Sequence, residues 1–549
     1  MILVFRAEPG KLVIANQVEE LMQYSVIDLF AGPGGLGEGF CSFSHSKGRY
    51  PFRIEMSVEK EKSAHKTLEL RAFFRQFSGR APEAYYQYLK GENELDRAKL
   101  FAAYPEKYKL AQKETLHGPR ALGNEDDDQI IYKRLRELRK TTKTWVVIGG
   151  PPCQAYSLVG RARNKGIKGY LPENDERHFL YEEYLKVLST IKPEIFVMEN
   201  VKGILSSKVN DQPVFPNILK DLKHPSKALG IRGGKGYKIY SLVCEQDSER
   251  VEDEKYIIRA EQYGIPQARH RVILLGVRTD LTVSPSQLNL AEGEVTTQSV
   301  IYDLPSLRSG VSKGTDSPEE WQSEIANAIS KIRKTVPSTV LGKSELNAIS
   351  KNASSHSSRG SRFQARRKKF KGCDKLRDWY LDERLNGFTN HETRSHISDD
   401  LARYMFCALY AEQIGVSPKA KNFPPSLSPK HANWKSGNFS DRFKVQVADK
   451  PSSTITSHIS KDGHYYIHPD PAQCRSLTVR EAARLQTFPD NYFFEGNRTQ
   501  QYVQVGNAVP PLLAQQIAEI VYKLLKTDQN SKKSKKSKTK SVRKYAEYS

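Results

Sequence analysis

The chain has 549 residues, more than one ordinary domain, and 38% of them are hydrophobic, which is enough for a sizeable core. The mean hydropathy is −0.61 and no run of about 18 apolar residues occurs, so we expect no membrane span. A net charge of +23 indicates a polyanionic partner, with nucleic acid as the first candidate.

The apolar patterning between residues 25 and 280 predicts a doubly wound α/β sheet. Four short, nearly continuous apolar runs predict parallel strands buried on both faces, and 3.6-residue spacing predicts a helix between them. The predicted strands are Ser25–Phe30, Trp145–Ile148, Ile195–Met198 and Val272–Val277, and the helix presents Leu180, Tyr184, Val187, Leu188 and Ile191 on one face.

A glycine-rich turn follows the first predicted strand, with G-x-G-x-x-G spacing at Gly32, Gly34 and Gly37. Glu59 comes about one βα unit later. Glycines let the backbone approach a ligand, and a carboxylate there can accept hydrogen bonds from a ribose diol. The turn therefore predicts an adenosine-bearing cofactor, which could be NAD, FAD or S-adenosylmethionine. A tight turn without a ligand is the alternative.

The six cysteines are scattered and contain no C-x-x-C pair, which argues against a disulfide framework and against a structural zinc or other metal site. Cysteines are more often buried small hydrophobes than nucleophiles. Cys153 differs from the others, because it follows a predicted strand and the run Gly149-Gly150-Pro151-Pro152. Catalytic groups favour the carboxyl ends of parallel strands, so this thiol is a candidate nucleophile. The six are Cys41, Cys153, Cys244, Cys373, Cys407 and Cys474.

Two further runs place chemistry beside predicted strands. Glu199 follows Ile195–Met198, so it is a candidate acid at the same sheet edge as the thiol. Arg269 and Arg271 precede Val272–Val277, where they can supply fixed positive charge to an anionic intermediate or to phosphate.

The second half of the chain differs in amino-acid composition and in apolar periodicity. From about 281 to 450, Ser, Lys, Asn and Pro become common and the periodicity weakens. Within it Arg359–Lys371 holds seven basic residues and no acidic one, which indicates either a solvated loop or, as we favour, contact with phosphates. A compact pattern returns at Ser453–Leu525 and ends in a predicted helix with Leu513, Ile517, Ile520 and Leu524 on one face.

The C-terminal segment Lys526–Ser549 is rich in lysine and serine and cannot bury a core. We expect it to be disordered and to act as a non-specific DNA tether.

Thiol, carboxyl and arginine suit one reaction well. C5 of cytosine takes up a methyl group only after a thiolate has added to C6, and a carboxylic acid at N3 drives that addition. A cytosine inside a duplex cannot be reached, so its nucleotide must be flipped out.

In chain order, these runs resemble the motifs of DNA (cytosine-5)-methyltransferases of the bacterial restriction–modification type. The resemblance includes the cofactor loop, the nucleophile loop, the glutamate motif, the arginine motif, a segment beside target recognition and the last motif. They are Asp28–Gly35, Gly150–Gln154, Glu199–Val201, Gln267–Arg271, Leu477–Asp490 and Gly506–Pro511.

The resemblance implies transfer of a methyl group from S-adenosylmethionine to C5 of a flipped-out cytosine in a specific double-stranded DNA sequence. Cys153 would be the covalent nucleophile and Glu199 the N3 partner, while Arg269 and Arg271 would hold the base and the nucleophile loop. S-adenosylmethionine would contact Phe30, Gly32, Gly34, Glu59, Leu180, Asn507 and Ala508.

The implied fold is a Rossmann-like α/β catalytic domain with a smaller, irregular target-recognition domain, the DNA cleft lying between them. The expected divisions are an N-terminal extension (1–24), the catalytic domain (25–280), the recognition domain (281–475), the final motifs and returning helix (476–525) and the basic tail (526–549).

The sequence also departs from the family pattern. Lys60 stands where an aromatic residue usually follows the ribose-binding acid, and a charged insertion occupies about 72–144. The third-strand aspartate is unassigned among Asp126, Asp127 and Asp128. Lys450–Thr456 resembles a threonine-containing turn that approaches DNA, and a turn followed by a strand is the alternative.

Three alternative functions agree less well with the sequence. An NAD-dependent oxidoreductase explains neither the Pro-Pro-Cys-Gln run nor the arginine motif. A tRNA cytosine-5 methyltransferase would usually have a smaller recognition region, and a non-catalytic DNA-binding relative would not need Cys153. With no signal peptide visible, we expect a cytoplasmic, nucleoid-associated monomer that works beside a cognate restriction endonuclease.

Overall fold

The computed structural model is centred on a seven-stranded sheet in the order β2-β1-β3-β4-β10-β7, with β8 paired to β10. Strands β2, β1, β3 and β4 are parallel, whereas β10 runs antiparallel to β4, β7 and β8. The bounds are β1 Tyr24–Leu29, β2 Phe52–Val58, β3 Trp145–Gly149, β4 Ile195–Val201, β7 Tyr237–Tyr240, β8 Ile257–Arg259 and β10 His270–Arg278.

The structure describes residues 23–46, 48–78, 80–141, 144–152, 179–209, 212–245, 252–313, 315–336, 343–429, 434 and 441–546. Within these ranges no helix is long and apolar enough to cross a membrane.

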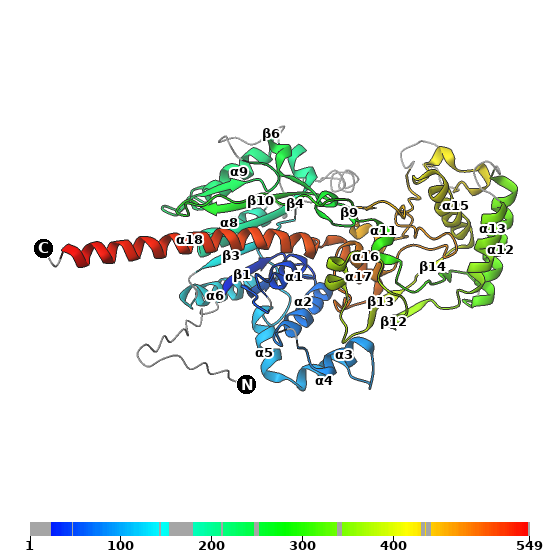
Figure 1. Cartoon of the computed structure of the whole chain (residues 1–549), viewed down its shortest axis with the longest axis horizontal. Helices are drawn as coiled ribbons and strands as arrows, with labels where there is room; N and C mark the ends of the chain where they lie inside the picture. The colour runs from blue at the N-terminus through cyan, green and yellow to red at the C-terminus, as the bar shows by residue number, and fades with distance from the viewer. Residues whose placement is uncertain are drawn as a thin grey trace, which may run out of the picture.

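Helices cover both faces of the sheet, so successive strand residues enter different apolar clusters. On one face Val26 packs with helices α1 (Gly35–Ser42) and α18 (Pro511–Ala546). On the other face Ile27 packs with α6 (Glu125–Thr141), α8 (Phe179–Ile191) and α9 (Phe215–Lys223). Figure 1 shows α18 running along the length of this lobe. The α/β fold class predicted from the sequence is confirmed.

The predicted direction of one strand is wrong. Val272–Val277 falls in β10, which is antiparallel to its neighbours. Its apolar run reflects burial under helices on both faces, and burial of this kind does not depend on strand direction.

A bundle of helices forms the far end of the molecule (Figure 1). Its apolar cluster joins α12 (Pro318–Thr335), α13 (Lys343–Ser354) and α15 (Ser398–Ile414) around Trp321 and Met405. The two-stranded pairings near it are β11 (Gly310–Val311) with β14 (Ser395–His396), and β12 (Gly360–Ala365) with β13 (Gly387–Glu392).

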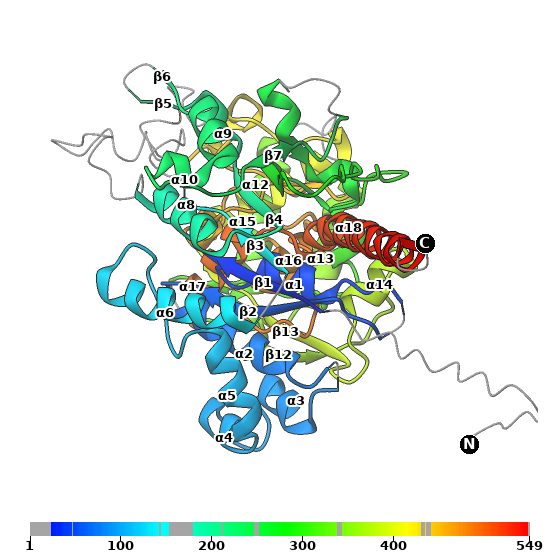
Figure 2. The ribbon, with the colours of Figure 1, turned by 90° about the vertical axis from the view of Figure 1, so that its left-hand side faces the viewer.

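Several short elements connect the bundle to the sheet. Among them β9 (Gln267–Ala268) pairs in parallel with β15 (Ser452–Ser453). A separate pair, β5 (Lys208–Val209) with β6 (Gln212–Pro213), lies near α9 in the sheet lobe (Figure 2). The short helices of this middle part are α11 (Thr297–Ile301), α14 (Asp374–Tyr380), α16 (Val479–Leu485) and α17 (Arg498–Asn507), whereas α10 (Pro225–Ala228) packs on α8 and α9 in the sheet lobe.

The charged insertion is mostly helical. It contains α3 (Glu83–Lys90), α4 (Arg97–Ala102) and α5 (Pro105–Glu114), which pack on α2 (Lys62–Arg75) through an apolar cluster that includes Phe73. Asp126, Asp127 and Asp128 lie in the first turn of α6, not at the end of a strand. Among the described residues β2 is an edge strand of the sheet. No further strand of the described chain lies beyond β2 to carry the expected aspartate.

Two basic segments contain regular structure, although the sequence indicated either a solvated loop or phosphate contact for Arg359–Lys371 and disorder for the C-terminal tail. Arg359–Lys371 contains β12, where the side chain of Arg362 donates to the carbonyls of Tyr88 and Leu89. The tail expected to be disordered continues α18 to Ala546. The start of this segment is attached to the body by the hydrogen bond that Tyr24 donates to Gln529, and within the helix Lys532 pairs with Asp528.

Candidate active site

Glu199 and Arg271 form an ion pair at the carboxyl end of β4. The Nε atom of Arg271 lies 2.9 Å from Oε1 of Glu199, and both side chains are mostly buried. Burial lowers the pKa of Arg271, while the neighbouring Glu199 carboxylate opposes that shift. The pair therefore presents a carboxyl group whose orientation is fixed by a guanidinium.

The chain leading to Cys153 passes directly over this carboxylate. A Cβ atom added to Gly150 would lie 2.4 Å from the carbonyl oxygen of Glu199 and 3.1 Å from its Oε2. Only glycine allows so close an approach. Cys153 itself lies outside the described residues, but Pro152, immediately before it, belongs to them.

Asn200 also fixes the segment that leads to Cys153. Its buried side chain donates from Nδ2 to the carbonyl of Pro151, at 3.1 Å, and accepts from the backbone N–H of Val201, at 2.8 Å. In the sequence Asn200 stands only as the second residue of the Glu199–Val201 motif. An amide directly after the candidate acid was the available signal for this role.

Arg269 has a different environment from Arg271. It is buried, its Nη1 donates to the carbonyl of Ile455 at 2.8 Å, and both Nη atoms lie 3.4 Å from the carbonyl of Gly506. Burial lowers its pKa strongly, and the charge of Arg271 adds to this effect. The structure thus brings Arg271 to Glu199 and places Arg269 between the Ile455 turn and the last motif.

Two buried glutamines connect the arginine motif with the last motif. Gln267 donates to the side chain of Gln486 at 3.0 Å and accepts from the backbone N–H of Ile455 at 2.8 Å. Gln486 donates in turn to the carbonyls of Val505 and Ala508. Both glutamines stand in motifs of the sequence, but no pattern there indicates that their side chains bond to each other, because the two residues are far apart in the chain.

The threonine-containing turn lies beside these residues. Ser452 and Ser453 pair with β9, and Thr454 donates to the carbonyl of Ala268 at 2.6 Å. The short strand is followed by a turn in which the side chains of Thr456 and Tyr466 meet at 2.8 Å. The turn is thus attached to the arginine motif.

Glu59 lies half-buried beside the glycine-rich turn. Its Oε2 accepts from the backbone N–H of Gly32 and its Oε1 from that of Glu61, both at 2.7 Å. Burial raises the pKa of Glu59, whereas these two hydrogen bonds oppose the shift. The carboxylate is therefore held directly against the turn, as the sequence predicted for a diol-binding acid, although the ligand itself stays a prediction.

The remaining predicted cofactor residues surround the same region. Phe30 is half-buried at the end of β1, and Gly34 precedes α1. Ala508 is buried and caps α17, whose last residue, Asn507, is exposed.

The end of the insertion completes this region. The backbone N–H of Arg120 donates to the carbonyl of Glu59 at 2.8 Å. A Cβ atom on Gly123 would lie 3.7 Å from Leu180, the half-buried predicted cofactor residue at the start of α8. Residues 120–123 therefore connect Glu59 with Leu180, at the edge of the sheet where no described strand lies beyond β2.

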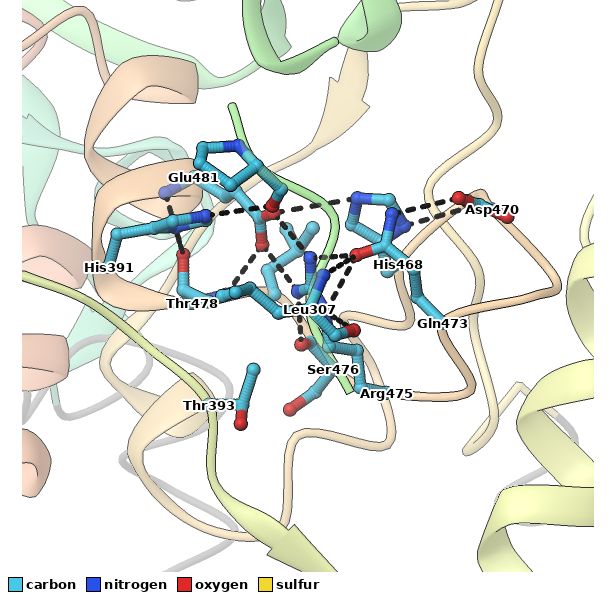
Figure 3. A network of polar contacts seen from close by, with 12 residues as sticks. Leu307, His391, Thr393, His468, Asp470, Gln473, Arg475, Ser476, Thr478 and Glu481 are labelled. Atoms are coloured by element: carbon cyan, nitrogen blue, oxygen red, sulfur yellow. Dashed lines mark hydrogen bonds and ion pairs between the residues drawn. The ribbon is translucent and has the colours of Figure 1, made fainter. Parts of the chain in front are cut away.

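A buried polar network holds the entry and exit of the bundle together (Figure 3). Arg475 donates to both carboxylate oxygens of Glu481, at 2.7 and 2.8 Å, and also to Gln473, Leu307 and Ser476. Burial alone would raise the pKa of Glu481, but the Arg475 guanidinium lowers it well below its usual range. Residues before α12 and after α15 are thereby joined to α16.

The same network fixes the first turn of α16. Thr478 accepts from the backbone N–H of Glu481 at 3.2 Å and contacts Nδ1 of His391 at 2.9 Å. The other ring nitrogen of His391 lies 3.2 Å from the carbonyl of Pro305. Burial lowers the pKa of His391 to about 4, so this ring is neutral near pH 7.

Comparison with known proteins identifies the family. The model of the C-5 cytosine-specific DNA methylase family matches residues 120–523. The chain belongs to this family. It is a DNA cytosine-5 methyltransferase by family membership, and the resemblance read from its motifs is confirmed.

Individual relatives agree with this assignment. The chain is 36% identical to the type II methyltransferase M.Bpa9945I of Bacillus paralicheniformis, over 90% of this chain and 98% of the relative. It is 26% identical to the DNA (cytosine-5-)-methyltransferase M.ApeKI of Aeropyrum pernix, over 69% and 81%. A solved structure from E. coli, described as a DNA modification methyltransferase encoded within a prophage, has a TM-score of 0.50 at 19% identity, covering 92% of this chain and 100% of that one; it shows a shared fold.

Proposed function

We propose that this enzyme transfers a methyl group from S-adenosylmethionine to C5 of a cytosine flipped out of a specific double-stranded DNA sequence. The observation that carries the proposal is the Arg271–Glu199 pair directly beneath the segment that leads to Cys153. This arrangement brings a carboxyl group to the sheet edge where the nucleophile is expected.

The residues around Glu59 fit S-adenosylmethionine. Each oxygen of Glu59 accepts one backbone N–H and keeps a lone pair for a ribose hydroxyl, and a Cβ on Gly32 would meet nothing within 4 Å. When bound, the cofactor supplies an electrophilic methyl group on a sulfonium. The residues that would hold it are Phe30, Gly32, Gly34, Glu59, Leu180, Asn507 and Ala508.

In the proposed reaction the Cys153 thiolate forms a bond to C6 of cytosine, which makes C5 nucleophilic. Glu199 binds N3 and favours this addition, and Arg271 keeps the Glu199 carboxyl in position. After C5 is methylated, its proton passes to a water molecule of the solvent, and the electron pair of the C5–H bond re-forms the C5–C6 double bond and expels the Cys153 thiolate. Arg269 acts as a positioning residue, because its donors are directed at the Ile455 and Gly506 carbonyls.

Four of the other cysteines are poorer candidates for the nucleophile. Burial raises the pKa of Cys41 to about 12 and raises those of Cys407 and Cys474 well above the usual range. A thiol in such surroundings is rarely ionised, and the thiolate is the reactive form. Cys373 is exposed and directly precedes α14.

The names of the relatives support a place in a restriction–modification system. M.Bpa9945I and M.DdeI of Desulfomicrobium norvegicum are both named type II methyltransferases, the latter at 27% identity over 68% of this chain and 71% of the relative. We infer that the enzyme protects host DNA from a cognate endonuclease. It would act in the cytoplasm, at the nucleoid, as a monomer.

Methylation and adduct mapping test the proposal together. Plasmid DNA is incubated with the purified protein and S-adenosylmethionine and then sequenced after bisulfite treatment, which reads C5 methylation at each site. A duplex with 5-fluorocytosine at the modified position should form a covalent adduct on Cys153. Cys153→Ala should abolish methylation, whereas the matched control Cys373→Ala should retain it. Methylation by Cys153→Ala, or an adduct on another cysteine, would overturn the mechanism.

A further inference from the structure

The helical insertion touches the strands that carry the bundle. In Figures 1 and 2, α3 lies directly beneath β12, on the side of the molecule where α2 packs against the insertion. The apolar cluster of the insertion includes Leu385, from the loop before β13, and Phe493, from the segment after α16. Segments far apart in the sequence thus share one small core.

Arg362 on β12 reaches across this contact. It donates from Nη2 to the carbonyl of Tyr88 at 2.6 Å and from Nε to that of Leu89 at 3.3 Å. Its guanidinium also lies over the rings of Tyr88 and Phe493, at 4.8 and 4.5 Å from their centroids. These carbonyls belong to the last turn of α3, where a cation is favoured.

Asp382 joins three parts of the chain at one carboxylate oxygen. Its Oδ2 accepts from the hydroxyl of Tyr86 in α3, at 3.0 Å, and from the side chain of Asn491, at 2.7 Å. Its Oδ1 accepts from the backbone N–H of Arg384, which orders the turn that carries it. The Arg384 guanidinium lies over the Tyr86 ring and donates to the carbonyl of Ala81.

From Asn491 the contacts continue to the glycine-rich turn. Arg71 of α2 donates to Asn491 at 3.1 Å and to Glu38 of α1 at 2.9 Å. The next residue, Tyr492, donates to the carbonyl of Pro33 within the turn, at 2.5 Å. The insertion, β12–β13 and the proposed cofactor turn are therefore connected by contacts that are partly buried at Arg362 and Asp382 and fully buried at Arg71 and Tyr492.

Strands β12 and β13 are the base of the bundle. After α13 the chain runs directly into β12, and β13 leads through β14 into α15. Two of the bundle's helices are attached to this strand pair. Fixing the strand pair therefore fixes the bundle relative to the sheet.

We infer that the helices α3–α5 form a positioning element that holds the β12–β13 strand pair. Through this pair they keep the recognition region at a fixed orientation to the methyl-donor site. Arg362 and Asp382 are the main attachment points of this element. The inference rests on the proposed function, since it assigns DNA recognition to the bundle. Loosening the attachment should weaken DNA binding although no altered residue touches the proposed reaction centre.

Substitutions of Arg362 separate contact from charge. Arg362→Ala should weaken binding of a fluorescent duplex about tenfold and leave kcat at saturating DNA within about twofold. Arg362→Lys keeps the charge but not the paired donors and ring contact, so it should also bind several-fold more weakly. Arg377→Ala is the matched control, because it removes an exposed arginine on α14 that pairs with Asp374 and Asp378 only. It should change the affinity by less than twofold.

Hydrogen exchange gives a readout that does not depend on catalysis. Amides of β12 and β13 should exchange faster in Arg362→Ala and, as a milder variant, in Tyr86→Phe. Unchanged duplex affinity and exchange in both variants would overturn the inference, as would full rescue by Arg362→Lys. Equal weakening by Arg377→Ala would assign the effect to charge. A wild-type protein that binds DNA without methylating it would refute the proposed function and leave this inference standing.

Discussion

Arg271 and Glu199 are diagonal neighbours on one face of an antiparallel strand pair. Glu199 lies opposite Ile273 and Arg271 opposite Val201, and the side chains meet at 2.9 Å. The antiparallel direction of β10 is what brings the start of this strand to the carboxyl end of β4. The acid and its partner thus come from motifs about 70 residues apart (271 minus 199).

The carboxyl group of Glu199 should be essential for rate. Glu199→Gln retains the size of the side chain but cannot act as an acid, so kcat should fall by about 10²-fold or more. Single-turnover methylation measures this step. Glu261→Gln, which changes the carboxyl that pairs with His270 next to the same strand, serves as the control and should stay within a few-fold of wild type. Wild-type turnover by Glu199→Gln would remove Glu199 from the mechanism.

Asn200→Ala should loosen the segment before Cys153. Without the amide, the Pro151 carbonyl loses its donor at 3.1 Å, and an unpaired buried carbonyl costs about 1–3 kcal/mol. We expect kcat to fall about tenfold while the KM for DNA changes little. The rate of adduct formation with 5-fluorocytosine DNA reports the same step. An adduct rate equal to that of wild type would contradict this role.

Gln267→Ala should destabilise the protein. It leaves the Ile455 N–H and the Gln486 carbonyl oxygen without their partner, at a cost of about 1–3 kcal/mol in the free energy of unfolding. Urea unfolding measures the change. Gln501→Ala is the control, since that exposed side chain donates only to the Gly496 carbonyl. Similar losses in both variants would show that the buried position of Gln267 is not the cause.

The stability of the enzyme should fall in mild acid. The folded pKa of His391 is about 4, against about 6.5 when unfolded, so only the unfolded chain takes up this proton in between. Its contribution is complete above pH 6.5 and is lost as pH falls towards 4, by at most about 3 kcal/mol. His391→Gln should flatten the pH dependence of urea unfolding. Some slope should remain, because burial also lowers the pKa of His468 to about 4. An unchanged slope would contradict the assignment.

Removing the basic end of α18 should weaken DNA binding uniformly and reduce its salt dependence. The truncation should end at Lys532, which retains the Tyr24–Gln529 hydrogen bond and the Asp528–Lys532 pair. A second truncation at Leu525 removes those contacts as well and should lower the melting temperature. Affinity for several duplexes at different salt concentrations tests the first expectation. Altered sequence preference would mean that the tail reads bases.

The sequence predicted those parts of the fold whose signals are local. The apolar runs located β1, β3, β4 and β10 to within two or three residues, and Tyr184 and Ile191 lie buried on α8 as their spacing predicted. The direction of β10 was wrong, because burial under helices on both faces looks the same for either direction. The helical extension of the tail was missed because composition does not register i,i+4 pairs such as Asp528–Lys532.

The candidate site was predictable only where residues stand in patterns. Glu59 and Gly32 were chosen from spacing, and they meet in a hydrogen bond. Gln486 and Asn491 act through single side chains on partners more than 100 residues away, and no local pattern can show that. The role of Cys153 stays a prediction, since that residue lies outside the described ranges.

The first and last helices of the fold are in van der Waals contact. A Cβ atom on Gly39 of α1 would lie 2.4 Å from the Ala514 side chain and from the Pro511 carbonyl of α18. A ribosome adds residues in order, so β1 and α1 wait for nearly the whole chain before this face of their core can form. A chain cut short before α18 should accumulate as an aggregation-prone fragment, not as a partly active enzyme. Newly made protein can then modify DNA only after α18 has been synthesised.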